Sequence, residues 1–498
     1  MIKTNWKMVS TMLFLFNPFT RSPAYFFDRQ KGNYEMKLSI IHQSRHRVAF
    51  LLFLVALLLT MLPIWGAIMR THAAGNSTQS KPFAFNFKGN HYTLAQNAPP
   101  PPTDKQCRSQ IGQPCYSPQE IRTAYGLNPV LKAGFTGKGQ TIVIIDSFGD
   151  PTIQHDLQVF DAAFGLPAPP SFREVAPLGK LKFNPKTPDM IGWAAEISLD
   201  VEWSHAMAPD ANIVLMTSPV DETQGVQGMP EFLYLEQYAV NHHLGHIISQ
   251  SWATTENTLF TTPGGRKVIS DFNTFYQKAA VENVTVFSSS GDGGVANPNI
   301  NGKIYPFPTV NFPASSPFVT AVGGTSLLAS IHGDYQSEAT WSGSGGGISQ
   351  FLKEPDYQKN LPASDQTLLN GHRGLPDVAF NADPGTGVLV YLSFPGVPAG
   401  WYIFGGTSEG SPTWSGIIAD GNQMAGHPLG FINPAVYALG NGSDYAESFH
   451  DITVGNNSQP GIPGYNATPG WDPTTGWGTP KIATFLQELI ERTGGQTT

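Results

Sequence analysis

The stretch Thr141-Ile-Val-Ile-Ile-Asp146 is an apolar run of β-branched side chains that ends on an acidic residue. Runs of this kind predict strands. Four similar runs follow along the chain, at 211–216, 246–249, 284–287 and 318–322. Between several of them lie stretches with a helical pattern, at 192–207, 231–243 and 270–282. Strands that alternate with helices predict an α/β fold with a mostly parallel sheet and helices on both of its faces.

The composition indicates a globular, loop-rich extracellular protein. Hydrophobic residues make up 40% of the 498 positions, and charged residues only 13%, about half the usual share of roughly 25%. The chain also has 52 glycines and 41 prolines. Its formal net charge of −8 does not fit nucleic-acid binding, which calls for basic patches. We therefore expect no nucleic-acid partner.

The segment 1–75 has the character of a targeting signal. The stretch from Val48 to Ile68 is almost wholly apolar, follows the basic tripeptide 45–47, and is followed by small residues at 73–75. This order predicts a secretory signal, with Met36 as an alternative start. The apolar stretch also has the roughly 20 residues needed to span a bilayer, so an uncleaved membrane anchor through 48–68 is the alternative. Either reading predicts an exported protein, with membrane contact only if this segment is retained.

The segment 76–114 is polar and includes the run Pro99–Pro102, which predicts an extended linker. Cys107 lies within this segment and Cys115 directly follows it, and the two flank a short loop. In an exported protein, such a pair predicts a disulfide. Zinc is the less suitable alternative, because two thiols without nearby histidines leave the ion under-coordinated. One large α/β domain is expected over 115–498.

The turn Gly405-Gly-Thr-Ser408 contains the first candidate for chemistry. It leads into the apolar, small-residue stretch Trp414–Ala419, which predicts a buried helix. Free N–H groups at a helix N-terminus can stabilise developing negative charge, so Ser408 is a candidate nucleophile. The alternative is an ordinary capping serine in a glycine-rich turn.

A nucleophilic serine needs a base, and the sequence offers carboxylates in preference to histidine. None of the 13 histidines lies in a His-Gly-Thr context. Glu196 and Asp200 instead lie four residues apart in the helical stretch 192–203, which puts them on one face, one turn apart. Two carboxyl groups forced together can share a proton and titrate as a pair. The alternative is a solvated acidic face, although the neighbouring Ala, Ile and Leu residues favour partial burial.

A third segment, Val286–Gly294, runs from a predicted strand into a glycine-rich turn that contains Asp292. Active sites in parallel sheets gather at the carboxyl ends of strands, so Asp292 is a candidate site residue. A plain turn aspartate is the alternative.

These three segments together resemble the sedolisins, the serine-carboxyl peptidases, over about residues 115–490. Further matching segments are Phe312–Thr325, Trp341–Gly347 and Arg373–Val378. The resemblance implies a subtilisin-like fold in which a glutamate replaces the histidine base. It also implies an activity, the hydrolysis of polypeptide substrates at acidic pH.

The resemblance assigns a role to each candidate. Ser408 becomes the nucleophile, Glu196 the general base and later the acid, and Asp200 the residue that orients Glu196 through a shared hydrogen bond. Asp292 would line the oxyanion hole. That last role requires a protonated carboxyl group, because an ionised carboxylate only accepts hydrogen bonds.

The resemblance also implies one structural Ca²⁺ near the C-terminus. The matching segments are Phe449–Thr453 and Asn466–Asp472. All-oxygen ligation with few carboxylates suits this ion. The alternative interpretation is that both aspartates are ordinary turn residues that bind no metal. The implied ligands are the carboxylates of Asp451 and Asp472 and the backbone carbonyls of Ile452, Thr468 and Gly470.

The sequence departs from the family pattern in three places. Glu409 follows the nucleophile where a small residue is usual, and Thr468 replaces a usual glycine. Only the residues 76–114 separate the signal or anchor segment from the domain, where most sedolisins have a long propeptide.

We expect a secreted, monomeric endopeptidase. The alternatives are an exopeptidase that removes tripeptides, and an inactive, surface-anchored homologue that acts as a binding protein.

Overall fold

A computed structural model describes residues 84–87, 90–96 and 100–494 of the chain. All of the described residues belong to one compact unit. The predicted signal or anchor segment, 1–75 with its apolar stretch 48–68, lies outside the described residues. None of the helices in the described ranges is long and apolar enough to cross a membrane.

The centre of the fold is an eight-stranded sheet, which confirms the predicted fold class. Its neighbouring strands are parallel except for the pair β10–β11. All five predicted strands belong to it. In spatial order the strands are β11 (Tyr335–Thr340), β10 (Thr320–Ala329), β8 (Thr285–Ser289), β6 (Ile247–Gln250), β3 (Thr141–Ser147), β5 (Asn212–Ser218) and β4 (Phe172–Val175), with β14 (Val378–Asn381) also paired to β10.

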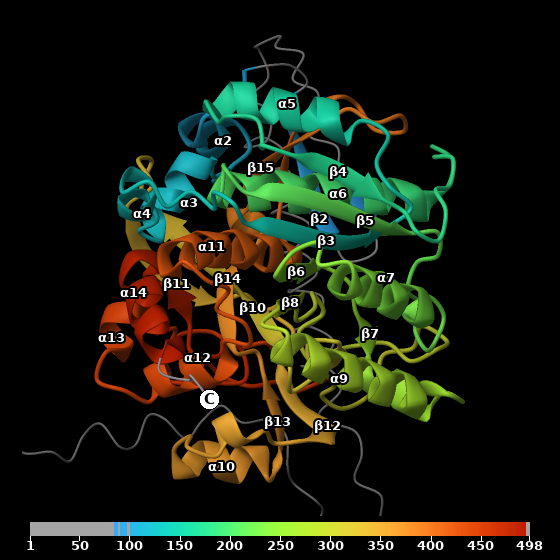
Figure 1. The fold of residues 1–498 in the computed structure, drawn as a ribbon, viewed down its shortest axis with the longest axis vertical. Helices are drawn as coiled ribbons and strands as arrows, with labels where there is room; N and C mark the ends of the chain where they lie inside the picture. Colours follow the sequence, from blue (N-terminus) through green and yellow to red (C-terminus); the bar gives the residue numbers. More distant parts are fainter. Residues whose placement is uncertain (1–83, 88–89, 97–99, 495–498) are drawn as a thin grey trace, which may run out of the picture. The chain divides into compact units, whose positions relative to one another are not determined.

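Helices cover both faces of this sheet, as the sequence predicts. Side chains alternate along β3, so Ile142 and Ile144 belong to one hydrophobic cluster, and Val143 and Ile145 to another. The first cluster includes α6 (Pro188–Met207) and α11 (Gly410–Ala425), and the second includes α7 (Met229–Asn241) and α9 (Gly265–Val281). Figure 1 shows α11 on one side of β6 and β8, and α7 and α9 on the other.

The segment 76–114 differs from the predicted linker, because much of it is folded. Two strands, β1 (Ala84–Phe87) and β2 (Asn90–Gln96), form a hairpin. The strand β2 pairs antiparallel with β16 (Gly400–Phe404), which pairs in turn with β15 (Val388–Leu392). The backbone groups of β2 thus find partners on the edge of a distant strand, and composition alone does not reveal such a partner. A helix, α2 (Asp104–Gln110), follows and begins with a capping box at Thr103.

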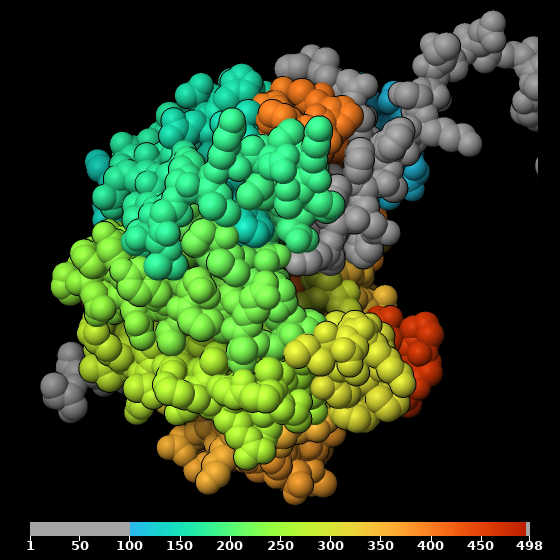
Figure 2. All heavy atoms as spheres, turned by 90° about the vertical axis from the view of Figure 1, so that its right-hand side faces the viewer, coloured from blue at the N-terminus to red at the C-terminus, as the bar shows by residue number. Residues whose placement is uncertain are grey.

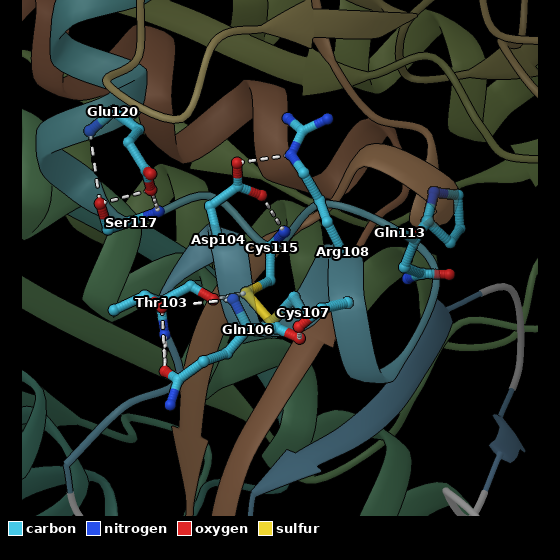
Figure 3. Close-up of a disulfide and its surroundings, with 11 residues drawn as sticks. Thr103, Asp104, Gln106, Cys107, Arg108, Gln113, Cys115, Ser117 and Glu120 are labelled. Carbon is cyan, nitrogen blue, oxygen red and sulfur yellow. Dashed lines mark hydrogen bonds and ion pairs between the residues drawn. A yellow bond between two sulfur atoms is a disulfide. The ribbon is translucent and has the colours of Figure 1, made fainter.

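The structure joins Cys107 and Cys115 in a disulfide, and both residues are fully buried. Asp104 supports this loop from inside, as Figure 3 shows. Its Oδ1 accepts a hydrogen bond from the backbone N–H of Cys115 at 3.1 Å, and its Oδ2 lies 2.6 Å from Nε of Arg108. The disulfide therefore connects α2 to the segment that enters the α/β domain.

The remaining elements form the rim of the fold and its connections. They are α3 (Pro118–Ala124), α4 (Asn128–Lys132), α5 (Ile153–Phe164), β7 (Thr254–Thr255), α8 (Glu256–Thr261), β9 (Asn311–Phe312), β12 (Gly347–Lys353), η1 (Asp356–Gln358), α10 (Ala363–Leu369), β13 (His372–Leu375), η2 (Pro384–Thr386), η3 (Thr407–Glu409), α12 (Asn433–Gly440), α13 (Tyr445–Ser448), β17 (Phe449–His450), β18 (Thr479–Pro480) and α14 (Ile482–Thr493).

Candidate functional site

Ser408 lies in the short 3₁₀ turn η3, directly before the first residue of α11. The residue is buried, with 5% of its surface exposed. Gly406, two residues earlier, has φ of 112°, and a Cβ atom there would approach Oδ2 of Asp292 to 2.7 Å. Both observations require glycine at this position. The glycine-rich turn therefore brings the nucleophile candidate against Asp292 at the N-terminus of a long, buried helix.

Glu196 projects from α6 toward Ser408 and forms a hydrogen bond with its side chain. Only 4% of Glu196 is exposed. Burial raises the pKa of Glu196 well above its usual range, the hydrogen bond with Ser408 lowers it, and the negative charges of Asp146, Asp292 and Glu222 raise it further. A glutamate with a raised pKa is thus in direct contact with the serine.

Asp200 lies one turn further along α6 and is fully buried. Its Oδ1 accepts a hydrogen bond of 3.0 Å from the hydroxyl of Ser251, which also lies 3.4 Å from the backbone oxygen of Ser408. Burial raises the pKa of Asp200 well above its usual range, and the charges of Asp146 and Glu196 add to the shift. Its second oxygen, Oδ2, is buried and has no hydrogen-bond partner within the described part of the chain. Asp200 therefore interacts with Glu196 through charge and with Ser408 through Ser251.

Asp292 lies in the turn that follows the carboxyl end of β8. Its Oδ1 accepts two hydrogen bonds from Thr407, one from the backbone N–H at 2.7 Å and one from the hydroxyl at 2.9 Å. Thr407 in turn accepts a hydrogen bond from the backbone N–H of Gly291 at 2.9 Å. The structure thus brings all four candidates, from α6, the turn after β8 and η3, into one group, in which Asp292 is half-buried and the other three are buried.

Asp146 is a fifth member of this group and its fourth acidic residue, which the sequence analysis did not identify. It is fully buried near the end of β3, and neither carboxylate oxygen has a hydrogen-bond partner among the described residues. Burial raises the pKa of Asp146 to about 8, and its charge acts on both Glu196 and Asp200. Its position as an acidic residue at the carboxyl end of an apolar strand was the signal available in the sequence.

The side chain of Glu409, the residue that follows Ser408, lies in the protein interior. It is fully buried, and Nδ2 of Asn381 on β14 lies 3.2 and 3.3 Å from its two carboxylate oxygens. Burial raises the pKa of Glu409 well above its usual range, and the charge of Glu338 raises it further. The side chain of Glu409 therefore bonds to β14.

A cavity of about 790 Å³ lies beside this group. It is lined by Glu222–Gln227 after β5, by Ala253 after β6, and by the turn from Asp292 to Ile300 after β8. On the face shown in Figure 2, a hollow lies between green and yellow segments of the chain. Because Asp292 is among the lining residues, the cavity opens directly onto the candidate site.

The two carboxylates expected to bind calcium lie close to the same loop. Asp451 accepts hydrogen bonds from the backbone N–H of Gly470 at 3.1 and 3.2 Å, and Oδ2 of Asp472 lies 3.3 Å from the backbone N–H of Thr468. The charges of both aspartates raise the pKa of Tyr445, so the two carboxylates converge. No group of three or more His, Cys, Asp or Glu side chains suited to a metal occurs among the described residues. Two neighbouring carboxylates still fit a hard cation such as Ca²⁺, which takes oxygen ligands.

Known proteins with similar sequences are peptidases of one kind. No family model matches the chain. The chain is 34% identical to kumamolisin of a Bacillus species over 363 residues, which are 71% of this chain and 59% of that protein. It is 30% identical to tripeptidyl-peptidase sed4 of Aspergillus fumigatus over 335 residues, 61% of this chain and 52% of that protein. The chain thus spans less than two thirds of the length of these relatives.

The structure also resembles a solved one. Pseudomonas sedolisin, a serine-carboxyl proteinase complexed with two molecules of pseudo-iodotyrostatin, superposes with a TM-score of 0.62 and 28% sequence identity. The match covers 75% of this chain and 98% of that chain. The likeness therefore extends over the whole α/β domain of the solved protein.

Proposed function

This chain belongs to the sedolisin family of serine-carboxyl peptidases, and we propose that it hydrolyses peptide bonds at acidic pH with Ser408 as nucleophile. The observation that carries this proposal is the hydrogen bond between Ser408 and Glu196 in a buried site that also contains Asp200. The use of a carboxyl group as the base supports an acidic working range, because an unperturbed glutamate has a pKa of about 4.3 and a general base works best when its pKa lies near the operating pH.

In the proposed reaction, the hydroxyl of Ser408 attacks the peptide carbonyl carbon while its proton passes to Glu196. Glu196 then gives that proton to the departing amine as the C–N bond breaks, which leaves an acyl-enzyme. Water then attacks the ester carbonyl carbon while its proton passes to Glu196. As the ester C–O bond breaks, Glu196 returns the proton to Oγ of Ser408 and the carboxylic acid product leaves. Asp200 would act on Glu196 through charge, so that the two carboxyl groups titrate as a pair and a proton on one favours the ionised form of the other.

Asp292 would stabilise the oxyanion that forms during each attack. Because Thr407 donates two hydrogen bonds to Oδ1, a proton on this carboxyl group would lie on Oδ2. That oxygen lies on the side of Gly406, where an added Cβ atom would approach it to 2.7 Å. One donor to an oxyanion is typically worth about 3 kcal/mol of transition-state stabilisation.

A second mode of action is supported by one comparison. The relative from Aspergillus fumigatus is called a tripeptidyl-peptidase, so removal of tripeptides from free N-termini is the alternative to internal cleavage. The inactive, surface-anchored homologue has less support, because the described residues include the complete set Glu196, Asp200, Asp292 and Ser408 in one group.

We also propose that one Ca²⁺ stabilises the C-terminal region without taking part in the chemistry. Asp451 and Asp472 would supply carboxylate oxygens, because they converge on one loop. The backbone carbonyls of Ile452, Thr468 and Gly470 would complete the set. The ion would neutralise the two carboxylates and link the segment 449–453 to the segment 466–472.

Export of the protein is a further part of the proposal. The disulfide Cys107–Cys115 supports an oxidising compartment, and the basic and apolar segment before it supports a secretory signal or an anchor. We propose an extracellular, monomeric protein, held to the membrane only if 48–68 is retained.

The proposal is tested by a pH–activity profile on a denatured protein substrate, with the cleaved bonds identified by mass spectrometry. We expect maximal activity in acid and cleavage at internal bonds. Release of tripeptides alone would favour the exopeptidase, and a maximum at neutral or alkaline pH would reject the glutamate mechanism.

A further inference from the structure

The two residues on either side of Ser408 are fixed by different parts of the fold. On the N-terminal side, Thr407 donates two hydrogen bonds to Asp292 in the turn after β8. On the C-terminal side, Glu409 is fully buried, and its carboxyl group accepts hydrogen bonds from Nδ2 of Asn381 on β14. Ser408 therefore lies between two anchors within the short turn η3.

Asn381 is a well-fixed partner for Glu409, because its buried amide group is fully hydrogen-bonded. Its Oδ1 accepts hydrogen bonds from the backbone N–H of Leu327 on β10 at 3.1 Å and from the hydroxyl of Thr386 at 2.9 Å. Its Nδ2 donates to the backbone oxygen of Thr386 at 2.8 Å as well as to Glu409. Asn381 thus connects the nucleophile turn to two strands of the central sheet.

The carboxyl group of Glu409 makes this contact in its neutral form. Burial raises the pKa of Glu409 well above its usual range, the hydrogen bond with Asn381 lowers it, and the charge of Glu338 on β11 raises it further. At the acidic pH proposed for the reaction, the anchor therefore brings no charge next to the nucleophile. Glutamine has the same carbonyl acceptor and nearly the same shape, so it should replace the protonated glutamate, and alanine should not.

We infer that Glu409 is a positioning residue, which keeps Ser408 at the distance and angle from Glu196 that proton transfer requires. The inference rests on the proposed peptidase function and assigns a role to a residue that departs from the usual family pattern. Glu409 acts through the turn, since its side chain bonds to β14. Loss of this anchor should slow the chemical step, because a displacement of about 1 Å at a catalytic group can reduce the rate about 10²-fold.

The first experiment compares Glu409→Ala and Glu409→Gln with the purified full-length wild type on one denatured substrate at one acidic pH. We expect Glu409→Ala to lower kcat by about 10–100-fold and to change KM by less than about twofold, because the substrate contacts remain. Glu409→Gln should restore most of the wild-type kcat. Glu409→Leu fills the space without accepting a hydrogen bond, so it should lose kcat as alanine does and provides the test if the alanine variant does not fold.

A buried carboxyl group outside the site provides the matched control. Glu256 on α8 is also fully buried and accepts a hydrogen bond of 2.8 Å from the hydroxyl of Ser349. Glu256→Ala removes the same atoms from the interior and should lower the melting temperature about as much as Glu409→Ala. It should nevertheless keep the wild-type kcat. Equal losses of kcat in the two alanine variants would show that Glu409 only stabilises the fold, and would overturn the inference.

Hydrogen exchange provides a test that does not need catalysis. In the Ser408→Ala background, the backbone amides of 406–410 should exchange faster after Glu409→Leu, and at the parent rate after Glu409→Gln or Glu256→Ala. Unchanged exchange after Glu409→Leu would overturn the inference. Faster exchange, together with a wild type that cleaves no peptide, would confirm the anchor and reject the peptidase proposal.

Discussion

Asp292 accepts two hydrogen bonds from Thr407, the residue immediately before the nucleophile candidate, at 2.7 Å from the backbone N–H and 2.9 Å from the hydroxyl. Both bonds go to the same carboxylate oxygen. The other oxygen is therefore the one able to carry a proton and donate it toward an oxyanion. This geometry joins the turn after β8 to the turn before α11, and it gives Asp292 a fixed orientation relative to Ser408.

The variant Asp292→Asn should separate hydrogen bonding from ionisation. Asparagine keeps an oxygen for Thr407 and an N–H donor for the oxyanion, and it cannot ionise. Its residual activity should therefore decline less steeply than that of the wild type as the pH rises. Asp292→Ala, which removes the donor, should lower kcat by about 10²–10³. Parallel pH–kcat profiles for Asp292→Asn and the wild type would contradict the oxyanion role.

The stability of the protein should fall as the pH rises from about 4 to 8, in part because of Asp146. Burial raises the pKa of Asp146 to about 8, whereas an unfolded aspartate has a pKa of about 3.9. Between these values the folded state keeps a proton that the unfolded state has released. One such group lowers the unfolding free energy by about 1.4 kcal/mol per pH unit in this range.

Asp146→Asn should therefore make the dependence of stability on pH shallower. Unfolding by denaturant would be measured at several pH values in the Ser408→Ala background, which avoids self-digestion. Asp271→Asn, at an exposed position on α9 paired with Lys267, is the control and should keep the wild-type slope. An unchanged slope for Asp146→Asn would show that Asp146 is ionised in the folded protein throughout this range.

Removal of calcium should lower the melting temperature. An ion present at about 100 times its dissociation constant stabilises the native state by about 2.7 kcal/mol, and this contribution is lost on chelation. Asp451→Ala should melt at the temperature of the chelated wild type and no longer respond to added Ca²⁺. A melting curve that does not change after thorough chelation would exclude a structural ion.

Loss of the disulfide should destabilise the protein moderately. Cys107 and Cys115 are separated by only eight positions, and closing so short a loop is worth about 2–3 kcal/mol. The double variant with serine at both positions should show this decrease in denaturant unfolding, and reduction of the wild type should reproduce it. Equal unfolding of the oxidised wild type and the double variant would show that the bond contributes little.

The sequence was sufficient for the parts of the fold that depend on local patterns. The β-branched run 141–146 became β3, and the small-residue stretch after Ser408 became α11. The pairing of β2 with β16 was not predictable in this way, because it depends on a strand edge about 300 positions away. The position of Asp146 at the carboxyl end of an apolar strand was a weak signal, which became decisive only with the packing of β3 against α6.

Covalent labelling with a fluorophosphonate at acidic pH tests most directly whether a glutamate activates Ser408. The labelled residue would be identified by mass spectrometry in the wild type, Ser408→Ala and Glu196→Gln, after confirming that all three have the same circular dichroism spectrum. We expect the label on Ser408 in the wild type, none in Ser408→Ala, and a rate at least about 10²-fold lower in Glu196→Gln. A label on another residue, or a Glu196→Gln variant that reacts as fast as the wild type, would contradict the account.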